Sequence, residues 1–234
     1  FDDRLFERLP EDEDFLDIYL GEGRVAAKKL IDYKEQEKLE IGDELSQIPS
    51  GIYADFKYID HAPVIMKLKG ANAVGIVGNS EQRYQLFKKI LIDIVSRQYH
   101  GDVKIYVLLD DDVKRYDWIR ELPHIQNNGS VRNIVCDNES KNNIFEYLYK
   151  ELTYRSEVKG EHVYNVILVM DEQGIKSHPI SKFIEKAGEL NTVFVFFEEK
   201  EEYLPLYCGS IAKLQEGNQG VLFESMDRGQ YQSF

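Results

Sequence analysis

The chain has 234 residues, of which 43% are hydrophobic, and its formal net charge is −13 at pH 7. This length and apolar content suit one large domain with a real core and exclude a globally disordered chain. The negative charge argues against a general nucleic-acid binder, which needs a cationic surface to displace the counterions of the phosphates. We therefore expect no nucleic-acid partner.

The chain has two cysteines, Cys136 and Cys208, which are too few for a disulfide framework and lack metal-ligand spacing. We expect two reduced thiols in a cytosolic domain. No apolar run approaches the about 20 residues that cross a bilayer, and no signal peptide is visible. Because the chain begins at Phe1 rather than at a methionine, we expect a fragment of a longer protein, with any membrane attachment outside it.

Residues 1–70 are rich in charge and carry short runs with strand character, at 15–20, 52–59 and 63–68, around a polar stretch at 34–44. These runs predict an N-terminal β-rich layer with a loop. From Ala71 the pattern changes to short apolar runs that alternate with longer amphipathic segments. We therefore divide the chain into a β-rich layer over 1–70 and an α/β domain over 71–234, which we expect to form one compact unit.

The α/β part reads as a mainly parallel sheet covered by helices on both faces, because apolar strands alternate with amphipathic helices. Strands are expected at 73–77, 103–109, 131–136, 163–170 and 192–197, and an edge hairpin at 211–214 and 220–223. Helices are expected at 141–157, at 180–190 and after the first of these strands. The apolar stripe of that first helix is formed by Leu86, Phe87, Ile90, Leu91, Ile94 and Val95.

The first helix has clear end signals. Asn79 can cap its start, with Gln82 three residues later as in a capping box, and Gly101 suits its stop. The strand, glycine turn and helix start occupy the place of a P-loop. A working P-loop reads G-x-x-x-x-G-K-[ST]: its backbone N–H groups wrap phosphate, its lysine binds the β- and γ-phosphates, and its hydroxyl binds Mg²⁺.

The glycine turn lacks these phosphate-binding groups in either alignment. The last three positions are Ser80, Glu81 and Gln82 when counted from Gly75, and Arg83, Tyr84 and Gln85 when counted from Gly78. Glu81 would repel a triphosphate, and Lys88 and Lys89 lie too far along the helix to replace the lysine. We therefore expect no cofactor at this degenerate P-loop position, although the helix N-terminus can attract a weakly held anion.

A dinucleotide fingerprint is the alternative for the same glycines. Gly75 and Gly78 lack the G-x-G start and the third glycine, and Asp110 ends the next strand too far along the chain for the ribose-binding acid. The fingerprint is therefore a poor match.

The strand at 163–170 ends in Asp171 and Glu172, which matches the Walker B pattern. There the aspartate holds Mg²⁺ and the glutamate orients the attacking water. The alternative is that acids often follow apolar strands. Without a phosphate cradle Mg-ATP has no anchor, so we interpret both residues as Walker B-like remnants and expect neither a catalytic residue nor a metal site.

A W-x-x-x-L-P-H segment runs from Trp118 to His124. We expect a buried tryptophan anchor and a turn, with His124 at the surface. The five histidines show no metal spacing, and no nucleophile elbow or Cys-His arrangement is present in the sequence.

Several of these segments resemble the FtsK/SpoIIIE-type ATPases of type VII secretion, called EssC or YukB in Firmicutes and EccC in mycobacteria. The most specific are the opening and the W-x-x-x-L-P-H segment. The opening comprises Arg4-Leu5-Phe6-Glu7-Arg8-Leu9-Pro10, Asp14-Phe15-Leu16 and Gly21-Glu22-Gly23. Weaker matches in the family's order are Asp43-Glu44-Leu45, Pro63-Val64 and Gly75-Ile76-Val77-Gly78. The resemblance covers nearly the whole chain.

The resemblance implies the domain between the transmembrane helices and the first of three tandem FtsK-like ATPase domains, with a P-loop-NTPase-like (RecA-like) fold and no competent P-loop. Retention of both Asp171 and Glu172 departs from a wholly inert domain. Implied partners are the adjacent ATPase domain and the secretion membrane subunits, with a hexamer for the full protein at the cytoplasmic face of the plasma membrane. ATP and Mg²⁺ then belong to the parent protein's other domains.

Three functions remain open. The first is a non-catalytic coupling module that links a membrane stalk to active ATPase domains. The second is a weak nucleotide-binding or ATP-hydrolysing domain that uses Asp171 and Glu172. The third is an unrelated Rossmann-type enzyme acting on a small molecule. The missing lysine argues against the second, and the missing dinucleotide fingerprint argues against the third.

Overall fold

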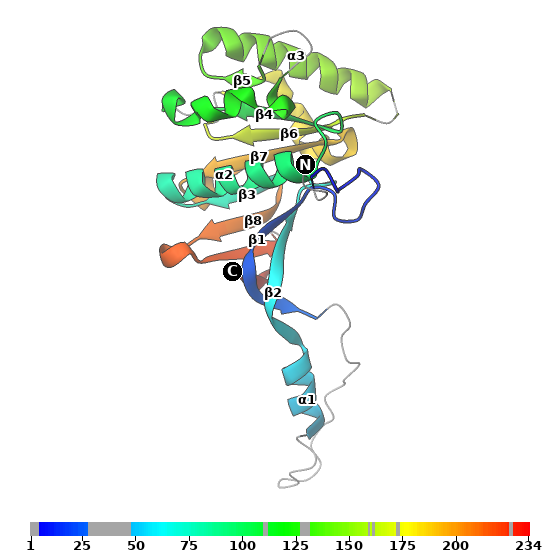
Figure 1. The fold of residues 1–234 in the computed structure, drawn as a ribbon, viewed down its shortest axis with the longest axis vertical. Helices are drawn as coiled ribbons and strands as arrows, with labels where there is room; N and C mark the ends of the chain where they lie inside the picture. Colours follow the sequence, from blue (N-terminus) through cyan, green and yellow to red (C-terminus); the bar gives the residue numbers. More distant parts are fainter. Residues whose placement is uncertain are drawn as a thin grey trace.

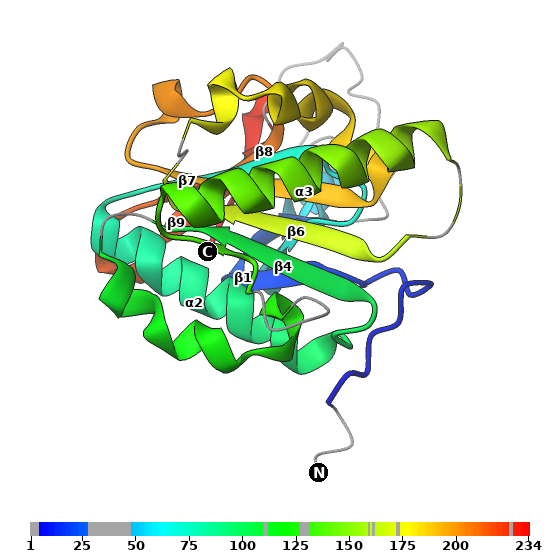
Figure 2. The same cartoon turned by 90° about the horizontal axis from the view of Figure 1, so that it is seen from above.

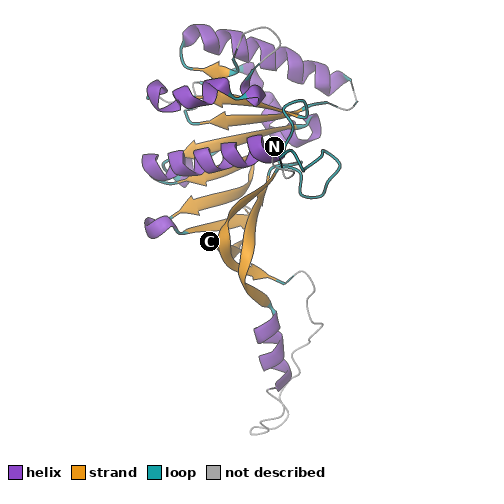
Figure 3. Cartoon of the chain, viewed as in Figure 1, coloured by secondary structure: helices purple, strands orange, loops and turns teal. Residues whose placement is uncertain are grey.

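A computed structural model describes residues 5–27, 48–109, 112–126, 132–158, 160, 162–171, 174–224 and 227–234. An eight-stranded sheet with helices packed on it forms the body, and a two-stranded hairpin projects from the body and ends in a short helix (Figure 1). The same view coloured by secondary structure shows the strands of both the body and the hairpin in orange and the helices in purple (Figure 3).

The sheet runs in the order β10-β9-β8-β3-β7-β6-β4-β5. Its strands are β3 (Ala73–Val77), β4 (Val103–Leu108), β5 (Ile134–Val135), β6 (Tyr164–Val169), β7 (Thr192–Glu198), β8 (Cys208–Leu214), β9 (Gly220–Glu224) and β10 (Asp227–Ser233). Every pair from β8 to β5 is parallel, and β9 is antiparallel to both of its neighbours. The predicted mainly parallel sheet is confirmed, and so is the pairing of 211–214 with 220–223. The edge strand β10 was not predicted.

Helices cover both faces of the sheet, as expected (Figure 2). One face carries α2 (Ser80–Arg97) and the 3₁₀ segments η2 (Val113–Glu121) and η3 (Pro123–Ile125), and the other carries α3 (Asn138–Glu157) and the 3₁₀ segment η5 (Pro179–Leu190). Short 3₁₀ turns are η4 (Ile175–Ser177), η6 (Glu201–Tyr203) and η7 (Glu216–Asn218). The predicted stripe of α2 is buried except for Val95, which is half-buried.

Two helix predictions differ in detail from the structure. The capping box at Asn79 and Gln82 is present, but α2 ends at Arg97, with Gln98 as its cap, before Gly101. The predicted helix at 180–190 is a 3₁₀ segment with non-helical backbone angles at Lys186. The predicted strand at 131–136 is reduced to β5, which pairs with β4 at two residues.

The hairpin consists of β1 (Asp17–Ala26) and β2 (Tyr58–Lys67), and α1 (Ile48–Phe56) precedes β2. The strand predicted at 52–59 is therefore wrong, because most of that run is helical and none of the residues of α1 is buried. The polar stretch at 34–44 lies outside the described residues. No helix in the described part of the chain is long and apolar enough to cross a membrane.

The base of the hairpin packs into the body. Phe15, Ile18, Val64 and Met66 are fully buried in the same hydrophobic core as Phe87 of α2. Side chains from both sides of residue 70 thus share one core, and the domain division at that residue stays a prediction.

Candidate functional site

The glycine turn after β3 is very short. β3 ends at Val77 and α2 begins at Ser80, so only Gly78 and Asn79 connect them. The backbone N–H of Gly78 donates to the carbonyl oxygen of Glu198 on β7, at 3.1 Å, so the turn stays tied to the sheet. A P-loop needs a longer excursion between strand and helix for several backbone N–H groups to surround a phosphate. The connection here has no such loop.

The first turn of α2 is closed by side chains of the chain itself. The side-chain oxygen of Asn79 accepts a hydrogen bond from the backbone N–H of Gln82 at 2.9 Å. The side-chain oxygen of Gln82 accepts one from the backbone N–H of Asn79 at 3.0 Å. Two of the N–H groups that a bound anion would use therefore already have partners.

Gly75 lies inside β3 rather than at its end. It pairs with Phe196 of β7 and Ile211 of β8, and a Cβ at this position would overlap the side chain of Leu204. The glycine thus lets the segment between β7 and β8 pack closely on the sheet. Its position is set by packing and leaves no room for phosphate.

Glu81 brings negative charge to the start of α2. Its carboxylate accepts a hydrogen bond from Gln85 at 2.5 Å and forms an ion pair with Arg115. The hydrogen bond from Gln85 and the charge of Arg115 hold the pKa of the Glu81 carboxyl below its ordinary value. The Arg115 guanidinium also lies 3.6 Å from the ring centre of Tyr84. A charged carboxylate therefore stands where a P-loop carries its lysine.

The lysines further along α2 are committed elsewhere. Lys89 Nζ donates to the carbonyl oxygen of Leu20 in the hairpin at 2.5 Å and lies 4.9 Å from the ring centre of Tyr19. Burial lowers the pKa of Lys89. Lys88 Nζ lies 5.0 Å from the ring centre of Tyr84. Lys89 thus fastens α2 to the hairpin, and Lys88 covers a tyrosine on its own helix.

Asp171 follows β6 at the same edge of the sheet, with β7 between its strand and β3. Its backbone N–H donates to the carbonyl oxygen of Leu108 at 3.3 Å. Its partner in the Walker B-like pair, Glu172, lies outside the described residues. The carboxyl ends of parallel strands are where open α/β sheets bind ligands, so this edge is the candidate site.

A shallow cleft of about 360 Å³ lies at this edge and mixes charges of both signs. Its lining side chains are Arg83, Met170, Asp171, Lys176, Glu198, Glu199 and Tyr203. Lys176 Nζ donates to the carbonyl oxygen of Tyr203 at 2.9 Å. Among the described residues, no group of three or more His, Cys, Asp or Glu side chains forms a metal site.

Of the residues that line the cleft, sequence reasoning found a role only for Asp171, and Arg83 is one of those it missed. It lies one helical turn beyond Asn79, and its Nη1 donates to the carbonyl oxygen of Phe197 on β7 at 2.9 Å. A projection of α2 could have placed it, because the residue four positions after the cap returns to the same side of the helix.

The W-x-x-x-L-P-H segment is arranged opposite to expectation. Trp118 is 38% exposed and His124 only 1%. Trp118 Nε1 donates to the Tyr84 hydroxyl at 3.3 Å, and His124 Nε2 lies 2.8 Å from the carbonyl oxygen of Gln98. The buried His124 therefore holds the segment against the main chain at the end of α2, whereas Trp118 lies partly exposed at the surface. Neither residue lines the charged cleft.

No protein-family model matches the chain. It is 24% identical over 232 residues to the type VII secretion system protein EssC of Staphylococcus aureus strain MSSA476, covering 94% of this chain and 16% of that protein. It is 24% identical over 211 residues to the ESX secretion system protein EccC of Geobacillus thermodenitrificans strain NG80-2, covering 86% of this chain and 14% of that protein. The chain is homologous to the EssC and EccC proteins of type VII secretion.

Solved structures of an EccC protein from another organism share the fold. The cytoplasmic domain of the type VII secretion ATPase EccC of Thermomonospora curvata gives a TM-score of 0.56 at 9% identity, covering 98% of this chain and 29% of that one. The structure of ATPases 2 and 3 of the same EccC, in complex with a signal sequence peptide, gives a TM-score of 0.51 at 10% identity. The match covers 74% of this chain and 38% of that one. The fold is therefore P-loop-NTPase-like, as predicted. The chain spans about one sixth of the length of the EssC proteins it matches.

Proposed function

We propose that this chain is a non-catalytic, ATPase-like coupling domain of a type VII secretion motor. It links the membrane stalk to the active ATPase domains at the cytoplasmic face of the plasma membrane. Its partners are then the adjacent FtsK-like ATPase domain and the membrane subunits of the secretion system, within a hexamer of the full protein. Homology to EssC and EccC supports the role in the motor.

One observation carries the non-catalytic part of the proposal. Gly78 and Asn79 alone join β3 to α2, and the capping box uses two of the first four backbone donors of the helix, those of Asn79 and Gln82. Because a triphosphate is held mainly by backbone N–H groups of a wrapped loop and by a lysine, the motif that anchors Mg-ATP is lacking here. ATP and Mg²⁺ then act in the other domains of the parent protein, and this domain needs no cofactor.

Titration calorimetry with Mg-ATP tests this proposal directly. We expect no heat of binding up to millimolar nucleotide. A Kd tighter than about 100 μM, roughly −5.5 kcal/mol, would overturn the proposal and favour a nucleotide-binding domain instead. An active ATPase domain of the same protein, measured in the same buffer, serves as the positive control.

A second experiment separates coupling from hydrolysis in the full-length secretion protein. Asp171→Ala removes the Walker B-like carboxylate, and a non-catalytic domain predicts unchanged ATP turnover and unchanged export. Deletion of the whole segment 1–234 should abolish export while the other domains still hydrolyse ATP. A loss of turnover in Asp171→Ala comparable to that of a Walker B variant in an active domain would contradict the proposal.

Weak nucleotide binding at the charged cleft is the second candidate, because Asp171 lines it together with the cations Arg83 and Lys176. The calorimetric experiment distinguishes the two candidates. The third reading, a Rossmann-type enzyme, has no support from the homologues.

A further inference from the structure

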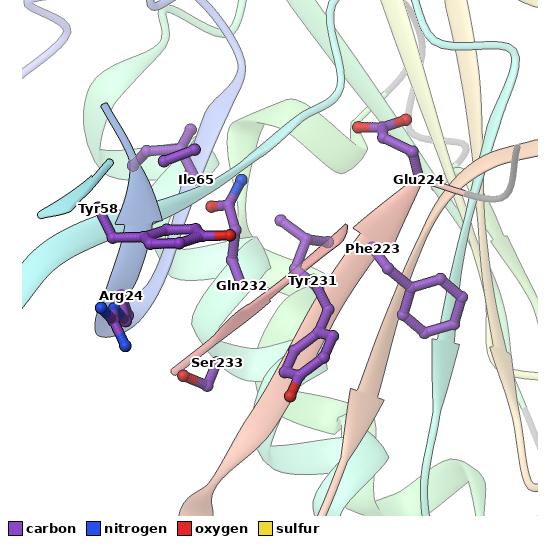
Figure 4. A pocket seen from close by; sticks show the side chains of 10 residues that line it. Arg24, Tyr58, Ile65, Phe223, Glu224, Tyr231, Gln232 and Ser233 are labelled. Atoms are coloured by element: carbon purple, nitrogen blue, oxygen red, sulfur yellow. The ribbon is translucent and has the colours of Figure 1, made fainter. Parts of the chain in front are cut away.

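A second groove, far from the charged cleft, opens between the hairpin and the end of the main sheet (Figure 4). Its volume is about 450 Å³, within the roughly 300–1,000 Å³ of ordinary ligand sites. The hairpin contributes Arg24, Ala26, Tyr58 and Ile65, and the sheet contributes Leu222, Phe223, Glu224, Tyr231, Gln232 and Ser233. None of these residues belongs to the proposed coupling function or to the degenerate P-loop position.

The groove runs along the outer edge of β10. In the described part of the chain, β10 pairs only with β9 and so is the edge strand of the sheet. Gln232 lies opposite Leu222, whose side chain is in the core, and Tyr231 lies opposite Phe223 on the other face. Side chains from both faces of β10 line the same space, which is expected of a space that follows the strand's edge.

Backbone groups of β10 point into this groove. Gly220 and Phe234 exchange two backbone hydrogen bonds, of 2.7 and 2.9 Å. In an antiparallel ladder, hydrogen-bonded and non-hydrogen-bonded pairs alternate, so the next hydrogen-bonded pair is Gln232 with Leu222. The N–H and C=O groups of Tyr231 therefore point away from β9. An outward-facing donor and acceptor on an edge strand form a template for another strand.

The hairpin closes one end of the groove. Gly23 of β1 approaches the backbone of β10 so closely that a Cβ would overlap the carbonyl oxygen of Ser233. Beyond this crossing, Arg24 of the hairpin stands apart from Tyr231, and the groove lies between them (Figure 4). Within the ranges that the structure describes, the edge of β10 is thus covered at Ser233 and left open at Tyr231.

The hairpin wall of the groove is aromatic and cationic. The guanidinium of Arg24 lies 4.8 Å from the ring centre of Tyr58, and both side chains line the groove. Arg24 also pairs with Asp60 at 3.4 Å, between side chains that are 58% and 71% exposed. Such an exposed pair is weak, so an incoming carboxylate can compete with Asp60 for the guanidinium.

We infer that this groove binds an extended peptide segment of a partner protein, which adds a strand to the open edge of β10. Its backbone pairs with the N–H and C=O of Tyr231, and an acidic side chain of the segment faces Arg24 on the hairpin wall. Backbone pairing supplies affinity in such strand additions, and the side-chain contacts select the sequence. The inference does not rest on the coupling function.

Nuclear magnetic resonance of the isotope-labelled chain tests the inference with a defined probe. The probe is an acetylated and amidated hexapeptide, Val-Thr-Val-Glu-Val-Thr. We expect amide shifts concentrated at Tyr231, Ser233, Tyr58 and Arg24. A probe with methylated nitrogens at alternate residues keeps its side chains but cannot pair as a strand. Its affinity should fall at least about tenfold, because the pairing supplies the affinity.

Two variants localise the interaction. Tyr231→Pro removes the outward N–H and is compatible with an edge strand, where that N–H has no ladder partner, so binding should be lost. Tyr231→Ala keeps the backbone donor and should weaken binding less. Arg24→Gln should reduce affinity up to about fivefold for the glutamate probe, and should not change it for the same peptide with glutamine at that position.

Several results would overturn the inference. One is the absence of amide shifts at a probe concentration of about 2 mM, which would occupy most of a site with a Kd of roughly 1 mM. The others are equal affinity for the methylated and unmethylated probes, and amide shifts at residues outside the groove. Concentration-dependent self-association with shifts at the same residues would also overturn it, because the groove would then be an interface between copies of this chain. Each measurement is independent of Mg-ATP binding, so its failure leaves the proposed function standing.

Discussion

Arg83 on α2 donates a hydrogen bond from Nη1 to the carbonyl oxygen of Phe197 on β7, at 2.9 Å. The same side chain lines the cleft that contains Asp171. An internal cation therefore bridges the helix after the glycine turn and the strand beside the Walker B-like residue. In an active P-loop site this region is occupied by the nucleotide and its metal.

The bridge is expected to contribute to stability. Arg83→Met keeps much of the side-chain length but removes the donor, and it should lower the unfolding free energy by about 1.5–3 kcal/mol, as expected for a hydrogen bond to a charged group. The measurement is urea denaturation followed by circular dichroism. Lys213→Met, at an exposed position on β8, is the matched control and should stay within about 0.5 kcal/mol of the parent. Equal effects of both substitutions would show that the Arg83 contact contributes nothing.

Gly23 should be intolerant of a side chain. In Gly23→Ala the new Cβ would overlap the Ser233 carbonyl oxygen, so the hairpin must move away from β10, at a cost of about 1–3 kcal/mol. Gly209→Ala on β8 is the control, because a Cβ there has no heavy atom within 4 Å. Denaturation midpoints of the two variants provide the comparison. A Gly23→Ala variant as stable as Gly209→Ala would mean that the hairpin does not dock closely on the sheet.

The body of this fold could be predicted well from the sequence, because most of its strands are short, mainly apolar and separated by amphipathic helices. β3, with all five residues buried, and α2, with its capping box, were both expected from local pattern alone. The charged cleft was foreseen only at Asp171, since Arg83 reaches it through the rotation of a helix and not through a motif.

The predictions failed where the environment of a residue depends on tertiary contacts, about which the local sequence pattern carries no information. Ile48, Ile52 and Phe56 are spaced four apart and lie on α1, but with 45–64% of each exposed they contribute to no core of the described chain. The strand at 52–59 was predicted because isoleucine, tyrosine and phenylalanine in this run favour β-structure. Trp118 and His124 exchanged their expected environments because the deciding contact, between His124 and the carbonyl oxygen of Gln98, is tertiary.

His124 should make stability depend on pH. Burial is the main cause that lowers its pKa below the ordinary 6.5, the charges of His100 and Lys104 lower it further, and the hydrogen bond with the Gln98 carbonyl opposes the shift. The unfolded chain takes up this proton near pH 6.5, whereas the folded chain takes it up only at lower pH. Between these two pKa values the unfolded state binds more protons than the folded state. The contribution of His124 to the unfolding free energy is therefore fully present above pH 6.5, and it is lost as the pH falls from there toward the folded pKa.

Urea denaturation at pH 7.5 and pH 5.0 measures this dependence. His124→Gln keeps a donor for Gln98 but cannot titrate, so the difference between the two pH values should shrink. It should not vanish, because burial also lowers the pKa of His178. His61→Asn, at an exposed position on β2, is the control and should keep the parent's dependence. An unchanged pH difference in His124→Gln would contradict the assignment to His124.

The sharpest prediction concerns which defect disables the P-loop position. The combined substitutions Ser80→Gly, Glu81→Lys and Gln82→Ser restore the complete pattern G-x-x-x-x-G-K-S from Gly75 onward. If the missing lysine were the only defect, this variant would bind Mg-ATP. We expect it not to bind tighter than about 1 mM, because Gly75 stays paired within β3 and only two residues connect that strand to α2.

Calorimetry with Mg-ATP and Mg-ADP measures the outcome, and denaturation verifies that the variant folds. Glu81→Lys alone is the matched control, since it removes the repelling carboxylate and adds the lysine charge without the glycine and the hydroxyl. Equally weak, salt-sensitive binding by both variants would reflect charge alone and agree with the expectation. Micromolar binding by the triple variant only would mean that the turn can open into a phosphate loop. The two-residue connection would then be a consequence of the lost residues, and loss of nucleotide binding would rest on the side chains and not on the backbone.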